Sequence, residues 1–294
     1  PLAGLVETRH RLSEAQPSPA SAQLSTHHRT ARHTDQMDEV GHARELLRQA
    51  ERVAVLTGAG ISTASGIGDF RGPQGRWTLD PDAEKVSTPS RYLNDPQVRI
   101  KAWRFRAESP VYDARPNAAH VALVGLEHGA KLTGLITQNT DGLHQLAGSN
   151  AELVIELHGN SRTWRCETCR ATGPMLEMVH RVRSGDADPR CPFDRGIVRA
   201  TTILFEEGLD GATIDAAVAA VDEADVLLVI GTSLSVHPAA GLVPYGRRRG
   251  VELIIVNAES TDYDQLAAHV LRDAIVQVVP ELFRPVDDEP PPSD

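Results

Sequence analysis

Residues 53–77, VAVLTGAGISTASGIGDFRGPQGRW, decide the fold of this 294-residue chain. The first five residues are apolar or nearly so, which predicts a short buried strand over 53–57. Gly58 and Gly60 follow the strand at once. Because glycine has no Cβ, a strand that runs into a Gly-x-Gly turn lets backbone N–H groups come close to a pyrophosphate. The stretch therefore predicts a turn that binds a nucleotide.

The stretch differs from the usual dinucleotide fingerprint at two points. Thr63 stands where that fingerprint has its third Gly. The fingerprint also needs an acidic residue about twenty positions later, at the end of the next strand. The nearest candidates, Asp80 and Asp82, lie in a Pro-containing loop. The glycines thus indicate a nucleotide but argue against an ordinary dehydrogenase.

Composition excludes several classes of protein. The net charge of −10 argues against a nucleic-acid-binding surface, which needs clustered Lys and Arg. No apolar run is long enough to span a membrane, and no secretion signal is visible. The three Cys, an odd number, do not look like a disulfide framework. The expected setting is a reducing cytoplasm.

Strands and helices are expected to alternate after the glycine turn. Strands are expected over 53–57, 132–137, 154–157, 201–205, 226–230, 253–256 and 275–279. Helices are expected over 38–50, 117–129, 175–183, 215–221, 238–248 and 262–268. Several strands are apolar throughout, as buried parallel strands require. The expected fold class is α/β, with a Rossmann-like parallel sheet.

The domain organisation follows from changes in composition along the chain. Disordered segments are expected at both ends, over 1–36 and 286–294. Met37 directly precedes the first expected helix, which makes it a candidate natural start. The sheet domain is expected to take residues 37–71, 116–157 and 200–285. A smaller helical and Cys-containing module is expected to take residues 72–115 and 158–199.

Polar segments follow four of the expected strands, at the edge where open α/β sheets bind ligands. The first is Gln138-Asn139-Thr140-Asp141-Gly142-Leu143-His144. Asp141 can accept a hydrogen bond from a carboxamide, although Asp141 or Asn139 can equally cap a helix. His158 ends the next strand and is followed by Gly, so it is a candidate general base rather than a buried structural histidine. Two later segments start at Gly231 and at Asn257.

Taken together, the motifs resemble those of the sirtuins, the NAD-dependent protein deacylases. The motifs that carry the resemblance are GAGISTASGI-x-DFRG, TQN-x-DGLH, ELHGN, Cys-x-x-Cys, GTSL-x-V-x-P and IIVNAEST, which occur in sirtuin order over roughly residues 37–282. The resemblance implies a Rossmann-like domain with a smaller inserted zinc-ribbon and helical module. It also implies NAD as cofactor and an acylated-lysine protein or peptide as partner, with the chain acting as a monomer.

The resemblance assigns roles to particular residues. Catalysis falls to His158, as the base, and to Asn139. The cofactor-binding set is Gly58, Ala59, Gly60, Thr63, Asp69, Phe70, Arg71, Trp77, Gln138, Asn139, Asp141, Gly231, Thr232, Ser233, Asn257, Glu259 and Ala274. The substrate set is Ile203, Phe205, Leu234 and Val236, where the peptide would add a short strand.

The metal site departs from the family pattern. Cys166, Cys169 and Cys191 supply three thiolates, and Asp194 stands where the family has a fourth Cys. We expect a zinc ion of reduced affinity with Asp194 as the fourth ligand, because structural sites overwhelmingly use Cys and His. His180 is an alternative ligand, and a Cys-x-x-Cys without metal is the other interpretation.

Other departures affect the active site rather than the fold. Gly68 replaces a Pro, Thr140 replaces an Ile or Val that touches nicotinamide, and Glu206 replaces a Gly. No Tyr and Arg pair is placed as in family members that remove succinyl groups, so acetyl or an apolar acyl chain is expected. Two other functions stay open: an NAD-dependent ADP-ribosyltransferase, and a non-catalytic NAD-sensing or peptide-binding module. Retention of His158 favours an enzyme.

Overall fold

The computed structural model describes residues 39–68, 88–204 and 207–284. These residues belong to one compact unit, which begins at Glu39. Residues 1–36 and 286–294, for which disorder is expected, lie outside the residues that the structure describes. Within the described residues, no helix is both long and apolar enough to cross a lipid bilayer.

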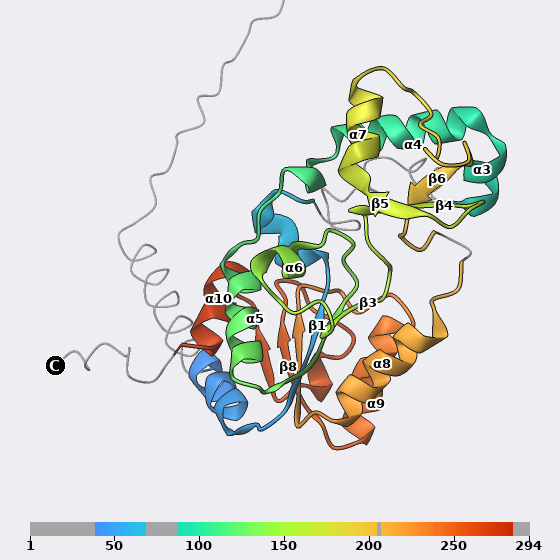
Figure 1. Ribbon diagram of the computed structural model, residues 1–294. Helices are drawn as coiled ribbons and strands as arrows, with labels where there is room; N and C mark the ends of the chain where they lie inside the picture. The colour runs from blue at the N-terminus through green and yellow to red at the C-terminus, as the bar shows by residue number, and fades with distance from the viewer. Residues whose placement is uncertain (1–38, 69–87, 205–206, 285–294) are drawn as a thin grey trace, which may run out of the picture. The chain divides into compact units, whose positions relative to one another are not determined.

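A six-stranded parallel sheet forms the centre of this unit (Figure 1). Its strands are β1 (Val53–Thr57), β2 (Leu132–Thr137), β3 (Val154–Glu156), β7 (Val226–Ile230), β8 (Glu252–Val256) and β9 (His269–Leu271). They are ordered β3-β2-β1-β7-β8-β9, and every neighbouring pair is parallel. The chain winds outward in one direction from β1 to β3 and in the other from β7 to β9. The switch point between β1 and β7 is where sheets of this kind bind ligands.

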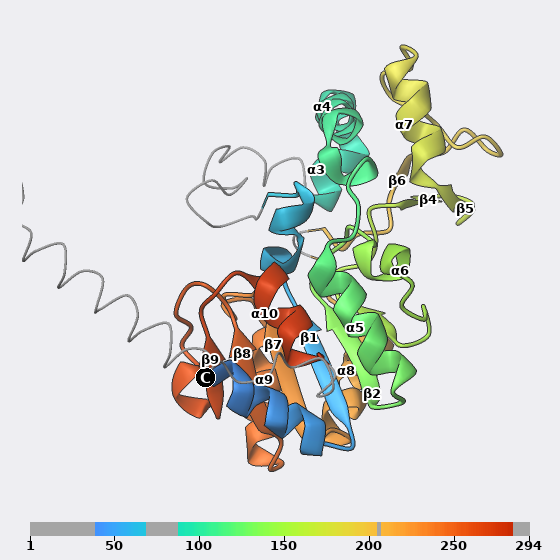
Figure 2. The same ribbon diagram turned by 90° about the vertical axis from the view of Figure 1, so that its left-hand side faces the viewer.

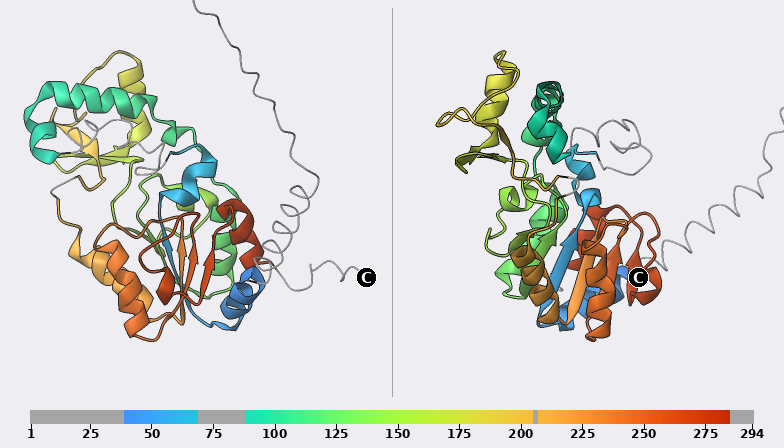
Figure 3. Two further views of the ribbon diagram at one scale, coloured as in Figure 1. Left: turned by 180° about the vertical axis from the view of Figure 1, so that it is seen from behind. Right: turned by 90° about the vertical axis from the view of Figure 1, so that its right-hand side faces the viewer.

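Helices cover both faces of the sheet (Figures 1 and 2). The helix of residues 39–49, α5 (Ala118–His128) and α10 (Ile275–Leu282) lie on one face, and α8 (Gly211–Asp222) and α9 (Leu242–Arg248) on the other. The view from behind shows the same two layers (Figure 3). Side chains of a strand alternate between faces, so Val53 and Val55 join the first core and Ala54 and Leu56 join the second. The α/β fold class is confirmed.

A second sheet, of three antiparallel strands, forms the smaller module. Its order is β5-β4-β6, with β4 (Thr163–Cys166), β5 (Thr172–Pro174) and β6 (Val198–Ala200). The helices around it are α3 (Pro89–Asn94), α4 (Pro96–Glu108) and α7 (Met175–Arg183). Trp103 of α4, Trp164 of β4 and Met178 of α7 pack in one buried cluster. This core holds the ribbon that carries the cysteines.

Short helices connect these elements and complete the loops near the switch point. They are η1 (Ala59–Ser65), η4 (Pro110–Tyr112), α6 (Leu143–Ala147), η5 (Ala239–Gly241) and η6 (Asp264–Leu266). Asn117 caps α5, because its side-chain oxygen accepts from the Ala119 N–H at 3.0 Å. Its amide nitrogen also donates to the Ile61 carbonyl at 2.8 Å. One side chain therefore fixes both the start of α5 and the glycine-rich turn.

Two of the expected strands are wrong. Residues 275–279 belong to helix α10, because Ile275, Val278, Val279 and Leu282 recur at helical spacing and line one buried face. Residues 201–204 are not a strand, and the neighbouring Val198–Ala200 forms β6 of the small sheet instead. Segment 262–268 contains only the 3₁₀ turn η6, which precedes the unexpected strand β9.

Candidate functional site

The loops that carry the candidate residues leave the sheet at one edge. The last residues of the strands are paired in register: Thr57 with Thr137, Thr57 with Ile230, and Ile230 with Val256. All of these strands run in the same direction, so their carboxyl ends lie level. The polar segments that follow them therefore meet, as expected for a ligand site at a switch point.

The glycine turn packs directly against the loop after β7. The N–H groups of Gly58 and Gly60 donate to the carbonyls of Ile230, at 3.0 Å, and Gly231, at 2.8 Å. A Cβ on Gly58 would lie 2.6 Å from the Cβ of Thr232, and one on Gly60 would lie 2.7 Å from the Cα of Gly231. The two glycines are thus needed for backbone-to-backbone packing at the switch point, and these two amides are engaged within the protein.

A buried hydrogen-bonded group lies beside this turn. The Asn139 amide nitrogen donates to the Gly58 carbonyl at 3.0 Å and to the Ser62 hydroxyl at 3.2 Å. The Ser62 hydroxyl donates to Asp141 Oδ2 at 2.8 Å, and Asp141 Oδ1 accepts from the Leu143 N–H at 2.9 Å. Asn139, Asp141 and Ser62 are each at most 5% exposed. The sequence pattern did not single out Ser62, which joins Asn139 to Asp141.

His158 is held by a backbone carbonyl of the neighbouring loop. Its Nδ1 lies 2.8 Å from the carbonyl oxygen of Gln138. A carbonyl only accepts, so this bond assigns the proton of the neutral ring to Nδ1 and leaves Nε2 as the basic nitrogen. The Gln138 side chain donates to the Thr232 hydroxyl at 3.0 Å. Gln138 thus joins the loops after β2, β3 and β7 into one site.

One of the two expected substrate segments contacts His158 directly. The Ile203 N–H donates to the His158 carbonyl at 2.9 Å. Leu234 is 3% exposed and packs in the core with Ala239, so only its backbone can face a peptide. Val236 is half-buried, two residues further on. Phe205, Glu206 and the cofactor residues Asp69, Phe70, Arg71 and Trp77 lie outside the described residues.

Thr140 turns its polar group toward the small module. Its hydroxyl lies 2.8 Å from the Ser161 hydroxyl, and its carbonyl accepts from the Ser161 N–H at 2.7 Å. Arg162 donates to the carbonyls of Asp141, at 2.5 Å, and Val111, at 2.6 Å. These bonds tie the loop after β2 to the segment that leads into the ribbon. Arg162 was not among the residues selected from the sequence.

The loop after β8 is arranged by another arginine. The Asn257 amide donates to the Glu259 carbonyl at 2.8 Å, and Arg272 donates to both carbonyls, of Asn257 at 2.8 Å and of Glu259 at 2.6 Å. Arg272 also pairs with Asp264. The side chains of Ser233, Glu259 and Ala274 are exposed, and Thr63 is exposed with its hydroxyl on the Gly60 carbonyl at 3.0 Å. These exposed groups have the access that a nucleotide needs.

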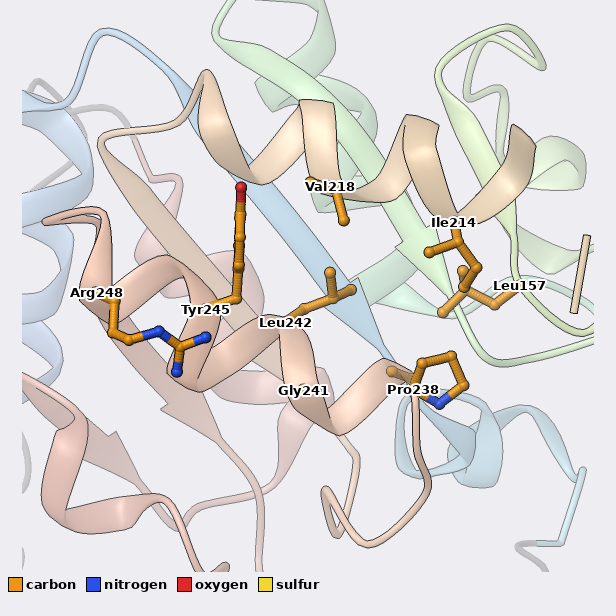
Figure 4. Close-up of a pocket in the computed structure, with 9 residues that line it drawn as sticks. Leu157, Ile214, Val218, Pro238, Gly241, Leu242, Tyr245 and Arg248 are labelled. Carbon is orange, nitrogen blue, oxygen red and sulfur yellow. The ribbon is translucent and has the colours of Figure 1, made fainter. Parts of the chain in front are cut away.

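An apolar hollow of about 180 Å³ lies between α8 and α9 (Figure 4). Among its nine lining residues, Leu157 and Pro238 flank the site, whereas Val218, Tyr245 and Arg248 line the groove between the helices. The Tyr245 hydroxyl already donates to Asp222. This lining lacks the paired donors and acceptors that ribose and phosphate need, so it is not the cofactor site.

Two buried histidines lie beneath the site. His120 and His144 are 0% and 2% exposed, and their ring centroids are 5.0 Å apart. His144 Nε2 lies 3.0 Å from the Thr57 hydroxyl, which donates to Thr137 at 2.8 Å. Burial lowers the pKa of His120 to about 4. Burial, and then the neighbouring His120, lowers the pKa of His144 to about 3.

These histidines predict a loss of stability in acid. Both folded-state pKa values lie below the usual value of 6.5, so the unfolded chain takes up protons first as the pH falls. Above pH 6.5 neither residue changes the stability. Between pH 6.5 and 4.5 we expect the free energy of unfolding to fall by roughly 3–5 kcal/mol from this pair. Urea unfolding at several pH values measures it.

A matched pair of variants isolates this effect. His144→Gln removes one buried titrating ring and should flatten the pH dependence, even if stability at pH 7 is lower. His180→Gln, at an exposed position on α7, should keep the wild-type slope. Equal slopes for wild type and His144→Gln would contradict the assignment.

Four candidate metal ligands come together in the ribbon. One ligand atom from each of Cys166, Cys169, Cys191 and Asp194 lies within 4.8 Å of all the others. Cys169 Sγ is 3.6 Å from Cys191 Sγ, and Cys166 Sγ is 3.3 Å from Asp194 Oδ1, while all three cysteines are free of disulfides. Ligands about 2.3 Å from a central tetrahedral zinc have similar mutual spacing. The donor set fits zinc, whereas His180 is not part of this cluster.

The carboxylate of Asp194 is prepared for this role. The Gly196 N–H donates to Asp194 Oδ1 at 2.9 Å, and this bond, followed by the contact with Cys191, lowers the pKa of Asp194. A Cβ on Gly196 would lie 2.8 Å from Cys166 Sγ. The ribbon therefore packs tightly at Gly196, beside an ionised carboxylate that is itself exposed.

The parallel sheet, the loops that converge at its switch point and the Cys₃Asp ribbon define a dinucleotide-binding α/β protein with an inserted metal-ribbon module. The model of the Sir2 family matches residues 58–238. The chain belongs to the Sir2 family, as its resemblance to the sirtuins predicted.

Curated relatives and solved structures agree with this assignment. NAD-dependent protein deacetylase 2 of Streptomyces coelicolor is 45% identical over 232 residues, which cover 79% of this chain and 96% of that protein. NAD-dependent protein deacylase of Thermococcus kodakarensis is 38% identical over 256 residues, which cover 85% of this chain and 96% of that protein. A Sir2 structure with deacetylated p53 peptide and 3′-O-acetyl ADP-ribose has a TM-score of 0.74 at 34% identity and covers 81% of this chain and 95% of that one. The structure of Sir2Tm bound to a propionylated peptide has a TM-score of 0.70 at 33% identity. The match covers 80% of this chain and 93% of that one.

Proposed function

We propose that this chain is an NAD-dependent protein-lysine deacylase, which transfers an acyl group from lysine to ADP-ribose and releases nicotinamide. The observation that carries the proposal is the 2.8 Å bond from His158 Nδ1 to the Gln138 carbonyl, beside the Ile203 backbone. This bond supports the proposal because it orients the imidazole next to the loop after β2, while the backbone of the same residue contacts the segment expected to bind the peptide.

His158 acts as the general base in this proposal. When bound, NAD supplies an activated ribose carbon with nicotinamide as its leaving group. With Nδ1 committed to the Gln138 carbonyl, Nε2 is the atom that accepts a proton from a ribose hydroxyl. The carbonyl of Gln138 stabilises the imidazolium that forms, because the Nδ1–H donates more strongly when the ring is charged.

Other residues bind and orient the cofactor. The group of Ser62, Asn139 and Asp141 is buried and hydrogen-bonded, and it contains amide and carboxylate oxygens suited to a carboxamide. Exposed groups after β7 and β8, including Ser233 and Glu259, suit the adenosine half. The ribbon would hold zinc through three thiolates and Asp194, and that ion would stabilise the small module rather than take part in the reaction.

The partner in this proposal is a protein or peptide with an acetylated or apolar-acylated lysine. The acetyl and propionyl groups named for the two Sir2 structures support short acyl chains. The net charge of −10 favours basic peptides over nucleic acid. The free cysteines favour a reducing compartment such as the cytoplasm. We propose that the chain acts there as a monomer, away from membranes.

Mass spectrometry of an acetyl-lysine peptide incubated with and without NAD tests the proposed function. We expect loss of the acetyl group only with NAD, together with nicotinamide and acetylated ADP-ribose. A gain of ADP-ribose on the peptide would instead show an ADP-ribosyltransferase. Binding of NAD with no change in peptide mass would show a non-catalytic NAD-sensing module, and reduced nicotinamide would show a dehydrogenase.

A further inference from the structure

A buried arginine connects the metal ribbon with the segment that follows β6. Arg199, on β6, is 4% exposed, so its charge requires partners. Its guanidinium donates to Glu167 Oε1 at 2.8 Å, to the Thr202 carbonyl at 2.9 Å and to Glu207 Oε1 at 2.5 Å. Each of the three guanidinium nitrogens therefore donates to an acceptor, and two of these acceptors are carboxylates.

Each partner of Arg199 fixes a different part of the small module. Glu167 lies in the ribbon turn, between the two thiolates of the Cys-x-x-Cys motif. Glu207 uses its other oxygen, Oε2, to accept from the Leu204 N–H at 2.8 Å. Thr202 immediately precedes Ile203, whose N–H donates to the His158 carbonyl. The backbone of Ile203 and Leu204 is thus held from both sides, by His158 and by the Arg199–Glu207 pair.

We propose that Arg199 is a positioning residue for the peptide substrate. Through Thr202 and Glu207 it holds the backbone of Ile203 and Leu204 in place for an acyl-lysine peptide, and through Glu167 it anchors that backbone to the ribbon. The inference rests on the proposed deacylase function. Arg199 touches neither His158 nor the dinucleotide loops in any contact described above, so its effect belongs to peptide binding.

Glu207→Gln is the sharpest test, because it keeps the shape of the side chain and removes the charge that faces Arg199. We expect the KM for an acetyl-lysine peptide to rise about 10- to 100-fold, since the loss of a charge-assisted hydrogen bond has effects of that size. The kcat and the KM for NAD should stay within about twofold to threefold. Arg199→Lys should act in the same direction, because lysine lacks the planar fork that serves three acceptors.

Arg165→Met is the matched control. Arg165 contacts the same Glu167 at 2.9 Å but lies 3.9 Å from Glu207 and is 30% exposed. Its loss should change the peptide KM by less than about fivefold, as for a partly exposed ion pair. Zinc content of all variants, measured by plasma mass spectrometry, shows whether the ribbon is intact.

Direct binding of a fluorescein-labelled acetyl-lysine peptide, measured by anisotropy, separates this inference from the proposed function. An active wild type whose peptide KM and affinity are unchanged in Glu207→Gln would overturn the positioning role. Equal losses of NAD and peptide affinity would also overturn it, because they indicate general damage. If wild type binds the peptide but does not deacylate it, the proposed function fails. In that case the difference in peptide affinity between wild type and Glu207→Gln still tests the positioning role of Arg199. A wild type that binds no peptide would overturn the positioning role.

Discussion

The His158→Ala variant is expected to lose deacylation while it keeps most of its affinity for NAD. Removal of a general base typically costs about 10²–10⁴-fold in rate. The buried Ser62–Asn139–Asp141 group is held by its own hydrogen bonds, so the proposed nicotinamide side of the site should keep its shape. Single-turnover assays with an acetyl-lysine peptide measure the loss, and calorimetric titration measures NAD binding.

His180→Ala is the control for that experiment. His180 lies exposed on α7 and outside the metal cluster, so its loss should leave the rate within about twofold, in line with surface substitutions generally. Full activity of His158→Ala would remove His158 from its role as base. Loss of NAD binding in the same variant would indicate that His158 supports the cofactor pocket instead.

The second large effect is expected at the ribbon, where Cys191→Ala should release the metal. Cys191 is 0% exposed and is one of four candidate ligands. Structural zinc contributes about 10–16 kcal/mol of apparent binding free energy in zinc-finger peptides, so a lost ligand should unfold much of the small module. Metal analysis and the far-UV circular dichroism of the purified variant measure both consequences.

Asp194→Cys should have the opposite effect on the metal. A fourth thiolate is the more usual ligand of structural zinc, so the variant should hold zinc more tightly than the wild type against a chelator such as EDTA. Asp194→Ala should lose zinc faster than the wild type, whereas His180→Ala should lose it at the wild-type rate. Wild-type protein purified without chelators that contains no zinc would refute the metal site.

Much of the sheet was predictable because buried parallel strands are continuously apolar. The runs at 53–57, 132–137 and 226–230 are found with those bounds as β1, β2 and β7. The run at 275–279 also suits a strand, because β-branched residues favour strands. The same residues also satisfy helical spacing, and only packing against α5 and η1 decides between the two periods.

The site was predictable at the positions that follow strands, and less so elsewhere. Asn139 and His158 come shortly after apolar runs, so topology alone predicts that they lie at the carboxyl edge of the sheet. Ser62 is one of several hydroxyl residues after the glycines, and its partner Asp141 is 79 positions away. Arg162 acts through backbone carbonyls, and Arg199 through one backbone carbonyl and two carboxylates, and the sequence does not mark which of these groups lie close together. Such contacts depend on where loops lie in space.

The partner that orients His158 is a main-chain atom, the carbonyl oxygen of Gln138. No exchange of the side chain at position 138 can delete that oxygen. The lining of the proposed nicotinamide pocket can therefore diversify, while the protonation pattern of the imidazole is set by the path of the backbone. Substitutions that change the acyl or cofactor preference of this protein can therefore leave the ability of His158 to accept a proton unchanged.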